Sequence, residues 1–159
     1  MDRTDFKISH LLDAAHSYAQ EVKLLSTCER TKPNGEKAAY ACVLLTSDLH
    51  IVSYGYNGVA AGLPNGCLHP DVPGGCGCIH AEENALLNVR SWVRPKVAVI
   101  TGAPCDRCAM RLVQAGIEYI IFEEPAHRAY PDADRILAHS GAMWGSIETV
   151  RPFLRRYFS

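Results

Sequence analysis

Apolar and polar positions recur with two different periods along this chain, and these periods predict its helices and strands. Between about residues 5 and 26 the apolar side chains return every three or four positions, which is the spacing of an amphipathic helix that covers a sheet. Residues 40–46 and 51–56 are short apolar runs separated by a four-residue polar stretch, and this arrangement predicts a β-hairpin.

Helical and extended patterns alternate after residue 79. They predict helices over residues 80–92 and 105–115, the second ended by Gly116, and strands over residues 96–101 and 117–122. We expect a further helix over residues 132–139 and a last strand over residues 147–150. Because strands that alternate with helices pair in parallel, the predicted fold class is α/β, with the N-termini of helices 80–92 and 105–115 at one sheet edge.

A long loop separates the hairpin from the alternating half of the chain. Residues 57–78 contain six of the twelve glycines and three of the nine prolines, which predicts a loop of about 20 residues. Loops of this length in compact domains are usually functional or are held by an anchor.

The composition is that of one domain covering residues 1–159, with 48% hydrophobic residues and a formal net charge of −1. The near-neutral charge argues against a broad nucleic-acid surface. No apolar run approaches the roughly 20 residues that span a bilayer, and the first residues do not lead into a signal peptide, so we expect no membrane partner. Seven cysteines, an odd number, favour free or metal-bound thiols in a reducing cytoplasm.

Two short motifs carry the candidate chemistry. His80 and Glu82 begin one predicted helix, and Cys105 and Cys108, three residues apart, share a face of the first turn of the next. One imidazole and two thiolates are the ligand set of an open zinc site, whose fourth position is left for water or substrate. Glu82 cannot share the metal-binding face of His80, so we expect it to act as a general acid and base. The alternative is a closed structural zinc site with a fourth protein ligand.

The motifs and their surroundings resemble the cytidine deaminase superfamily, and within it the deoxycytidylate (dCMP) deaminases. The resemblance covers most of the chain, from the first predicted helix to Leu137. It is carried by Ser26-Thr27-Cys28-Glu29-Arg30, Gly55-Tyr56-Asn57-Gly58, His80-Ala81-Glu82-Glu83-Asn84-Ala85, Thr101-Gly102-Ala103-Pro104-Cys105-Asp106-Arg107-Cys108-Ala109 and Gln114-Ala115-Gly116-Ile117. The His-x-Glu and Cys-x-x-Cys parts are typical of the whole superfamily. The Gly-Tyr-Asn-Gly and Gln-Ala-Gly-Ile segments indicate the dCMP branch.

The resemblance implies a three-layer α/β/α sandwich built on a five-stranded mixed sheet, with Zn²⁺ held by His80, Cys105 and Cys108. The implied enzyme is a hydrolase that converts dCMP to dUMP and ammonia. In it, Glu82 would move protons from water to N3 of cytosine and then to the leaving ammonia.

The resemblance also implies residues that bind the substrate. Asn57 would hydrogen-bond the sugar, although an Asn-Gly pair is equally typical of a plain turn. The backbone around Ala81 and Ala103 would read the base, and Arg30 is the first candidate for the 5′-phosphate. Two further cationic candidates follow it, Lys32 and Arg107.

Some dCMP deaminases carry a second, structural zinc on cysteines placed like Cys28 and Cys67. The soft ligands in or beside the long loop are Cys28, Cys67, Cys76, Cys78 and His69. Four or five such ligands would anchor a glycine-rich loop. The alternative is that several are simply buried apolar residues, as we expect for Cys42 on its strand.

The family also implies partners. Its dCMP deaminases are usually hexamers that respond to dCTP and dTTP with Mg²⁺, so the resemblance implies a homo-oligomer and these effectors. Three other functions stay open: a deaminase of another free cytosine-type base, nucleoside or modified nucleotide such as a 5-substituted dCMP, a deaminase of RNA or single-stranded DNA, and an inactive zinc-binding module. The near-neutral charge disfavours the second, and the presence of Glu82 disfavours the third.

The sequence departs from the family pattern at two places. The first strand begins Tyr40-Ala41-Cys42-Val43-Leu44 after inserted residues 33–37, where the family usually has a Val-Gly-Ala-Val run. Ala126 stands where the family often has a tyrosine. We expect both departures to affect the base or phosphate pocket, so the reaction class is better defined than the substrate.

Overall fold

The computed structural model describes residues 1–73, 75–123 and 130–158. In this part of the chain five strands form one sheet in the order β2-β1-β3-β4-β5. β1 (Ala41–Leu45) is antiparallel to β2 (Ile51–Tyr56) and to β3 (Val97–Ile100), whereas β4 (Tyr119–Ile121) and β5 (Met143–Gly145) continue the sheet in parallel with β3. The predicted five-stranded mixed sheet is therefore confirmed.

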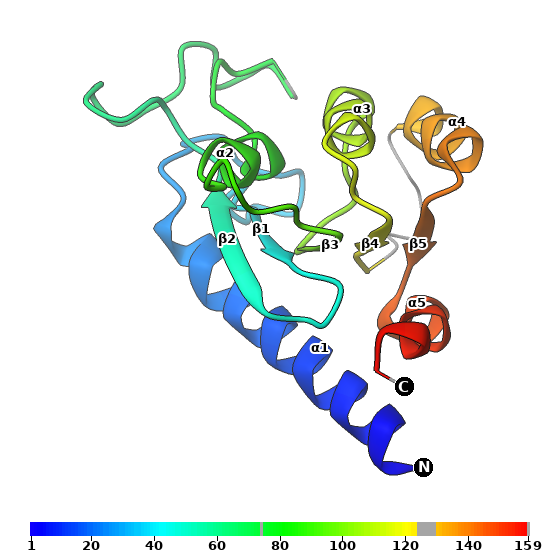
Figure 1. The fold of residues 1–159 in the computed structure, drawn as a ribbon. Helices are drawn as coiled ribbons and strands as arrows, with labels where there is room; N and C mark the ends of the chain where they lie inside the picture. The colour runs from blue at the N-terminus through cyan, green and yellow to red at the C-terminus, as the bar shows by residue number, and fades with distance from the viewer. Residues whose placement is uncertain (74, 124–129, 159) are drawn as a thin grey trace.

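Helices cover both faces of this sheet, which gives the expected three-layer sandwich (Figure 1). α1 (Arg3–Val22) and α5 (Ile147–Leu154) lie on one face, and α2 (Ala81–Leu87), α3 (Asp106–Gln114) and α4 (Pro131–Ser140) lie on the other. Short 3-10 turns, Lys23–Leu25 and Arg155–Tyr157, follow α1 and α5. Among the described helices, none combines the length and the apolar character that crossing a membrane requires.

The central strands explain why the sequence shows continuous apolar runs there. Alternate residues of β1 point to opposite layers: Val43 and Leu45 pack with α1 and α5, and Cys42 and Leu44 pack with α2 and α3. All five residues of β1 are buried, because the strand lies between two strands and two layers of helices. Cys42, at 0% exposure, is the buried apolar residue that its position on a strand predicts.

The predicted strand over residues 147–150 is wrong, because this segment begins a helix. The Ser146 side chain caps α5 by accepting a hydrogen bond from the Thr149 N–H at 3.3 Å. The apolar residues Ile147, Val150 and Leu154 then recur at a helical spacing of three and four, and the last two are fully buried. The last strand of the sheet comes earlier, at Met143–Gly145.

Two predicted helices are longer than the observed ones. The helix predicted over residues 80–92 ends at Leu87, where the side chain of the C-cap residue Asn88 bonds the Tyr54 carbonyl of edge strand β2 at 3.2 Å. Trp92, four residues further on, is 74% exposed. The first helix ends at Val22 because the chain tightens into a 3-10 turn, which leaves Leu25 half exposed.

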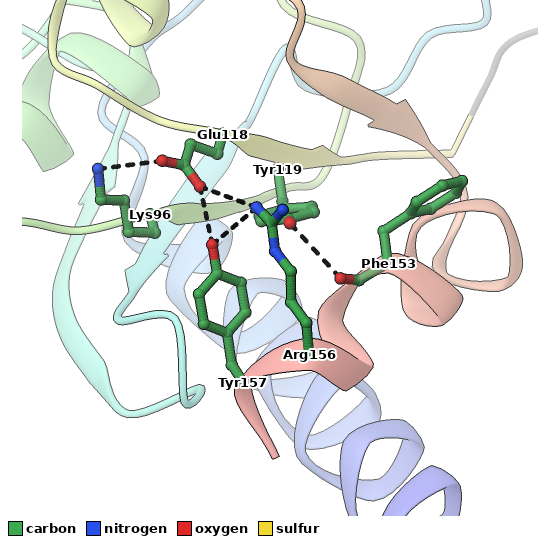
Figure 2. Close-up of polar contacts among 6 residues, drawn as sticks. All are labelled: Lys96, Glu118, Tyr119, Phe153, Arg156 and Tyr157. Atoms are coloured by element: carbon green, nitrogen blue, oxygen red, sulfur yellow. Dashed lines mark hydrogen bonds and ion pairs between the residues drawn. The ribbon is translucent and has the colours of Figure 1, made fainter. Parts of the chain in front are cut away.

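A polar cluster binds the C-terminal residues Arg156 and Tyr157 to the start of the parallel strands (Figure 2). Glu118 forms ion pairs with Lys96 at 3.3 Å and Arg156 at 3.5 Å, and it accepts a hydrogen bond from the Tyr157 hydroxyl at 2.9 Å. This cluster lies at the sheet edge where β3 and β4 begin, opposite the edge that carries the candidate site.

Candidate active site

The predicted site residues gather at the edge of the sheet where β2 and β3 end and antiparallel β1 begins. His80 and Cys105 are the N-cap residues of α2 and α3, and both have extended backbones, with ψ angles of 156° and 172°. Each chain segment therefore delivers its side chain just before the first helical turn, where the backbone dipoles favour anionic ligands. The prediction that both motifs lie at helix N-termini on one edge is confirmed.

The three predicted metal ligands converge on one point. The Sγ atoms of Cys105 and Cys108 lie 3.5 Å and 3.4 Å from Nδ1 of His80. A tetrahedral zinc ion with ordinary Zn–S and Zn–N distances separates a sulfur and a nitrogen ligand by about 3.6 Å. The ligand set and its spacing therefore fit zinc, and the three residues supply three of its four positions.

The electrostatics of this trio also suit a divalent cation. The hydrogen bond from Cys108 lowers the pKa of Cys105 to about 3, while the same contact and burial raise the pKa of Cys108. The neighbouring Cys105 thiolate raises the pKa of His80. The site thus holds a stabilised thiolate beside a buried thiol, and a bound cation would balance its negative charge.

Glu82 lies beside the trio on the first turn of α2, and its side chain is 6% exposed. Burial raises the pKa of Glu82 above its ordinary value. A carboxyl group that is shielded from water and has a raised pKa exchanges protons more readily near neutral pH than an exposed one.

A cavity opens directly over these groups. It brings together most of the predicted substrate residues, namely Asn57, Ala81, Ala103 and Arg30. Among the described residues, its lining is Cys28, Arg30, Ala38, Tyr40, Asn57, Cys76, Cys78, His80, Ala81, Glu82, Ala103, Cys105 and Tyr130.

The side chain of Asn57 forms hydrogen bonds within the wall of this cavity. Its Oδ1 accepts hydrogen bonds from Ser26 Oγ at 2.7 Å and from the Tyr40 N–H at 2.8 Å, and its Nδ2 donates to the Ala38 carbonyl at 2.6 Å. The carboxamide therefore joins three segments of the wall. One hydrogen of Nδ2 stays available to a ligand, so the turn interpretation and the sugar-binding interpretation are compatible.

The three candidate cations for a phosphate group are in different places. Arg30 lines the cavity. The Nζ atom of Lys32 lies 4.9 Å from the centre of the Tyr40 ring, at the cavity wall but not among its lining residues. Arg107 lines a separate cavity behind α2 and α3, together with Arg111 and Glu83. Arg107 does not line the cavity over the metal-binding trio, so Arg30 is the best placed of the three for a phosphate in that cavity.

Four cysteines form a second cluster next to the cavity. The Sγ atom of Cys28 lies 3.4 Å from that of Cys67 and 3.9 Å from that of Cys76, and Cys67 lies 3.5 Å from Cys78. Two sulfur ligands of a tetrahedral zinc ion are about 3.8 Å apart, so the four thiols fit a closed site. His69 is not part of this cluster among the described residues, and its inclusion as a candidate ligand was wrong.

Sequence reasoning missed two aromatic walls of the cavity. Tyr40 lies across from Gly102, where a Cβ atom would come within 2.8 Å of the Tyr40 ring, so the glycine makes room for it. Tyr130 lines the cavity just before α4, whereas Ala126, where a tyrosine was expected, lies outside the described residues. The unusual first residue of the strand motif was the only available signal for Tyr40.

Comparison with known proteins places this geometry in a family. The model of the cytidine and deoxycytidylate deaminase zinc-binding region matches residues 15–124. The deoxycytidylate deaminase of Saccharomyces cerevisiae is 30% identical over 141 residues, which are 81% of this chain and 42% of that protein. The human deoxycytidylate deaminase is 32% identical over 136 residues, which are 76% of this chain and 69% of that protein.

Solved structures show the same fold. The dCMP deaminase of cyanophage S-TIM5 in its apo form superposes with a TM-score of 0.65 at 20% identity, covering 86% of this chain and 97% of that one. The structure of that protein in complex with dCMP and dUMP gives a TM-score of 0.64 at 22% identity, covering 83% of this chain and 93% of that one.

Proposed function

Because this chain belongs to the cytidine and deoxycytidylate deaminase zinc-binding family, we propose that it is a hydrolase that converts dCMP and water to dUMP and ammonia. The observation that carries the proposal is the cavity in which the buried carboxyl of Glu82 lies beside His80, Cys105 and Cys108. Relatives named deoxycytidylate deaminase support the choice of dCMP.

His80, Cys105 and Cys108 would hold the zinc ion, which supplies Lewis-acid activation of water in such sites. Glu82 accepts the proton of the attacking water and delivers it to N3 of cytosine as C4 is attacked. Glu82 then takes the remaining proton from the hydroxyl oxygen now on C4 and gives it to the departing amino group, so that ammonia leaves and C4 keeps a carbonyl oxygen. Because Glu82 is buried, bulk water does not compete for these protons.

The cavity wall orients the nucleotide in the proposed complex. Backbone groups at Ala81 and Ala103 read the base, and the remaining Nδ2 hydrogen of Asn57 meets the sugar. Arg30 binds the 5′-phosphate, since its guanidinium can form two parallel hydrogen bonds with phosphate oxygens.

A second zinc ion in the four-cysteine cluster is part of the proposal. Cys28, Cys67, Cys76 and Cys78 would form a closed structural site that fastens the loop between β2 and α2. Both zinc sites need reduced thiols, which supports the cytoplasm as the place of action.

We extend the proposal to assembly and regulation on the basis of the family. Residues 1–159 act as one deaminase domain in a homo-oligomer, a hexamer by resemblance, with dCTP and dTTP as effectors together with Mg²⁺. Light scattering of the purified protein tests the assembly. A monomer would contradict this part and leave the chemistry untouched.

The reaction is tested by ammonia release from dCMP, deoxycytidine, dCTP, CMP and 5-methyl-dCMP with the zinc-loaded protein. The expected result is turnover of dCMP well above that of deoxycytidine, because Arg30 has no phosphate to bind in the nucleoside. Turnover of only a 5-substituted nucleotide would keep the mechanism and change the substrate. No turnover of any of the five compounds would contradict the proposed activity.

A further inference from the structure

We propose that the four-cysteine site controls nucleotide affinity, because metal bound there fixes one wall of the substrate cavity. This inference rests on the proposed function. Besides anchoring the loop, the second metal is then directly coupled to substrate binding. The inference is based on the position of the cluster next to the cavity: three of its four thiols, Cys28, Cys76 and Cys78, also line the cavity.

The backbone connects the cluster to the substrate residues over very short distances. Cys28 is two residues before Arg30, the proposed phosphate ligand, and Cys78 is two residues before His80. Each of these sulfurs is therefore linked through two peptide units to a proposed ligand of the phosphate or of the catalytic zinc.

A second connection passes through Asn57. The Ser26 hydroxyl donates to both the side chain and the backbone carbonyl of Asn57, at 2.7 Å and 2.8 Å, and accepts a hydrogen bond from the Cys28 N–H at 3.3 Å. Next to Asn57, Gly58 exchanges two backbone hydrogen bonds with Ile79, at 3.1 Å and 2.7 Å. Ile79 lies between Cys78 and His80, so the cluster, the sugar ligand and the catalytic histidine share one network.

In its described part, the loop that carries three of the thiols is hydrogen-bonded to the rest of the domain chiefly at its two ends, through Asn57 and the bridge between Gly58 and Ile79. Between β2 and α2 the described residues form turns and single bridges, with no helix or strand. Between these ends, the side chains of Leu63, Leu68 and Val72 are 61%, 76% and 48% exposed, so burial of their apolar surface does little to hold the middle of the loop. Metal–thiolate bonds are the strongest restraint available to this wall.

Coupling between two sites is reciprocal: if metal in the cluster tightens nucleotide binding, bound nucleotide must slow the loss of that metal. This reciprocity separates the inference from a purely structural role, which would raise the melting temperature without linking the two ligands.

The first experiment measures zinc release from the wild-type protein to a chromophoric chelator, with and without dUMP, the proposed product. Two zinc ions per chain are expected. The phase that belongs to the four-cysteine site should slow by roughly 10-fold with dUMP, inside the usual 5- to 150-fold range for coupled sites. A single zinc per chain, or a release rate unchanged by dUMP in protein that turns over dCMP, overturns the inference.

The second experiment uses Cys67→Ser, since Cys67 is a cluster member that does not line the cavity. We expect loss of one zinc and of the dUMP-sensitive phase, with KM for dCMP raised roughly 10-fold and kcat changed less than about threefold. His69→Ala, in the same loop but outside the cluster, is the matched control and should keep both zinc ions and the wild-type KM.

The two proposals fail in different ways. Absence of dCMP turnover in the wild-type protein with its full zinc content contradicts the proposed function. A Cys67→Ser variant that loses one zinc and keeps the wild-type KM contradicts the coupling while the proposed function stands. If the variant does not fold, the dUMP effect on wild-type zinc release still decides the question.

Discussion

Among single residues, the polar side chains on which the site depends are buried. Glu82 and Asn57 are 6% and 7% exposed, and Ser26, which bonds Asn57, is 4% exposed. Burial of such groups costs free energy unless each one finds a partner, so their partners are part of the design of the site.

Replacement of Glu82 by glutamine tests the proton-transfer role at nearly constant shape. The amide cannot accept the proton of water, so we expect kcat for dCMP to fall by at least about 10²-fold, the usual contribution of a positioned acid and base. Zinc content and melting temperature should stay at wild-type values. A Glu82→Gln variant with full zinc and wild-type ammonia release would contradict the mechanism.

Replacement of Asn57 by alanine should destabilise the protein as well as weaken binding. It removes the partners of the Tyr40 N–H and the Ala38 carbonyl, and one of the two acceptors of Ser26 Oγ, in a buried place. We expect the free energy of unfolding in urea to fall by about 2–4 kcal/mol.

Asn88→Ala is the matched control for Asn57→Ala. Asn88 is exposed and its amide makes a single bond to the Tyr54 carbonyl, so its loss should cost less than about 1 kcal/mol. Equal losses for the two variants would contradict the scaffolding role of Asn57.

At the scale of elements, an ion pair joins the two helices that present the catalytic ligands. Oε1 of Glu83 on α2 lies 2.6 Å from a guanidinium nitrogen of Arg111 on α3, and Oε2 accepts a hydrogen bond from the His80 N–H at 3.1 Å. Glu83 therefore holds the histidine backbone and the neighbouring helix at once, which fixes the separation of His80 from the two thiols.

Arg111→Ala should loosen this connection between α2 and α3. We expect the catalytic zinc to be lost to a chelator roughly 5- to 10-fold faster, with a loss of stability of about 1 kcal/mol, because the pair is partly exposed. The control is Arg107→Ala, one helical turn earlier and exposed, which should release zinc at the wild-type rate. Equal acceleration in both variants would point to a general charge effect.

At the scale of the whole molecule, the C-terminal segment closes the face of the sheet opposite α2, α3 and α4 by docking onto both the sheet and α1. Arg155 forms ion pairs with Asp2 at 2.6 Å and Asp5 at 2.9 Å, next to the N-terminus of α1. Glu118 binds Arg156 and Tyr157 from the same segment (Figure 2). These contacts keep α5 on its face of the sheet without contributing to the cavity.

Glu118→Gln tests this docking through pH. Although partial burial opposes it, hydrogen bonds from Tyr157 and Lys96 lower the pKa of Glu118. A lowered carboxyl pKa means that the stabilisation is present above the pKa of the unfolded chain and is lost as pH falls. At pH 7 the variant should lose about 0.5–1 kcal/mol in urea unfolding, and near pH 4 the difference from wild type should shrink. A difference that grows toward low pH would contradict the assignment.

Features that depend on local pattern could be predicted from the order of residues. The apolar runs at β1 and β3 predicted buried strands because those strands are covered on both faces. The spacing of His80, Glu82, Cys105 and Cys108 predicted a zinc-binding trio with an adjacent carboxyl, since N-cap positions and ligand chemistry are local properties. Gly116, with its φ of 84°, ended α3 as predicted, because only glycine adopts that conformation easily.

Features that depend on segments far apart in the chain could not be predicted in this way, because they arise from three-dimensional packing. The short apolar segment after Ser146 fits either a strand or a helix by pattern, and its packing against α1 and the sheet selected the helix. Tyr40 and Tyr130 are 90 residues apart in number, and no local pattern shows that they face one cavity. The structure also placed Arg30, rather than Arg107, in the cavity, and it grouped the four cysteines without His69. The direction of a loop side chain depends on what it packs against, so neither result could be read from neighbouring residues in the sequence.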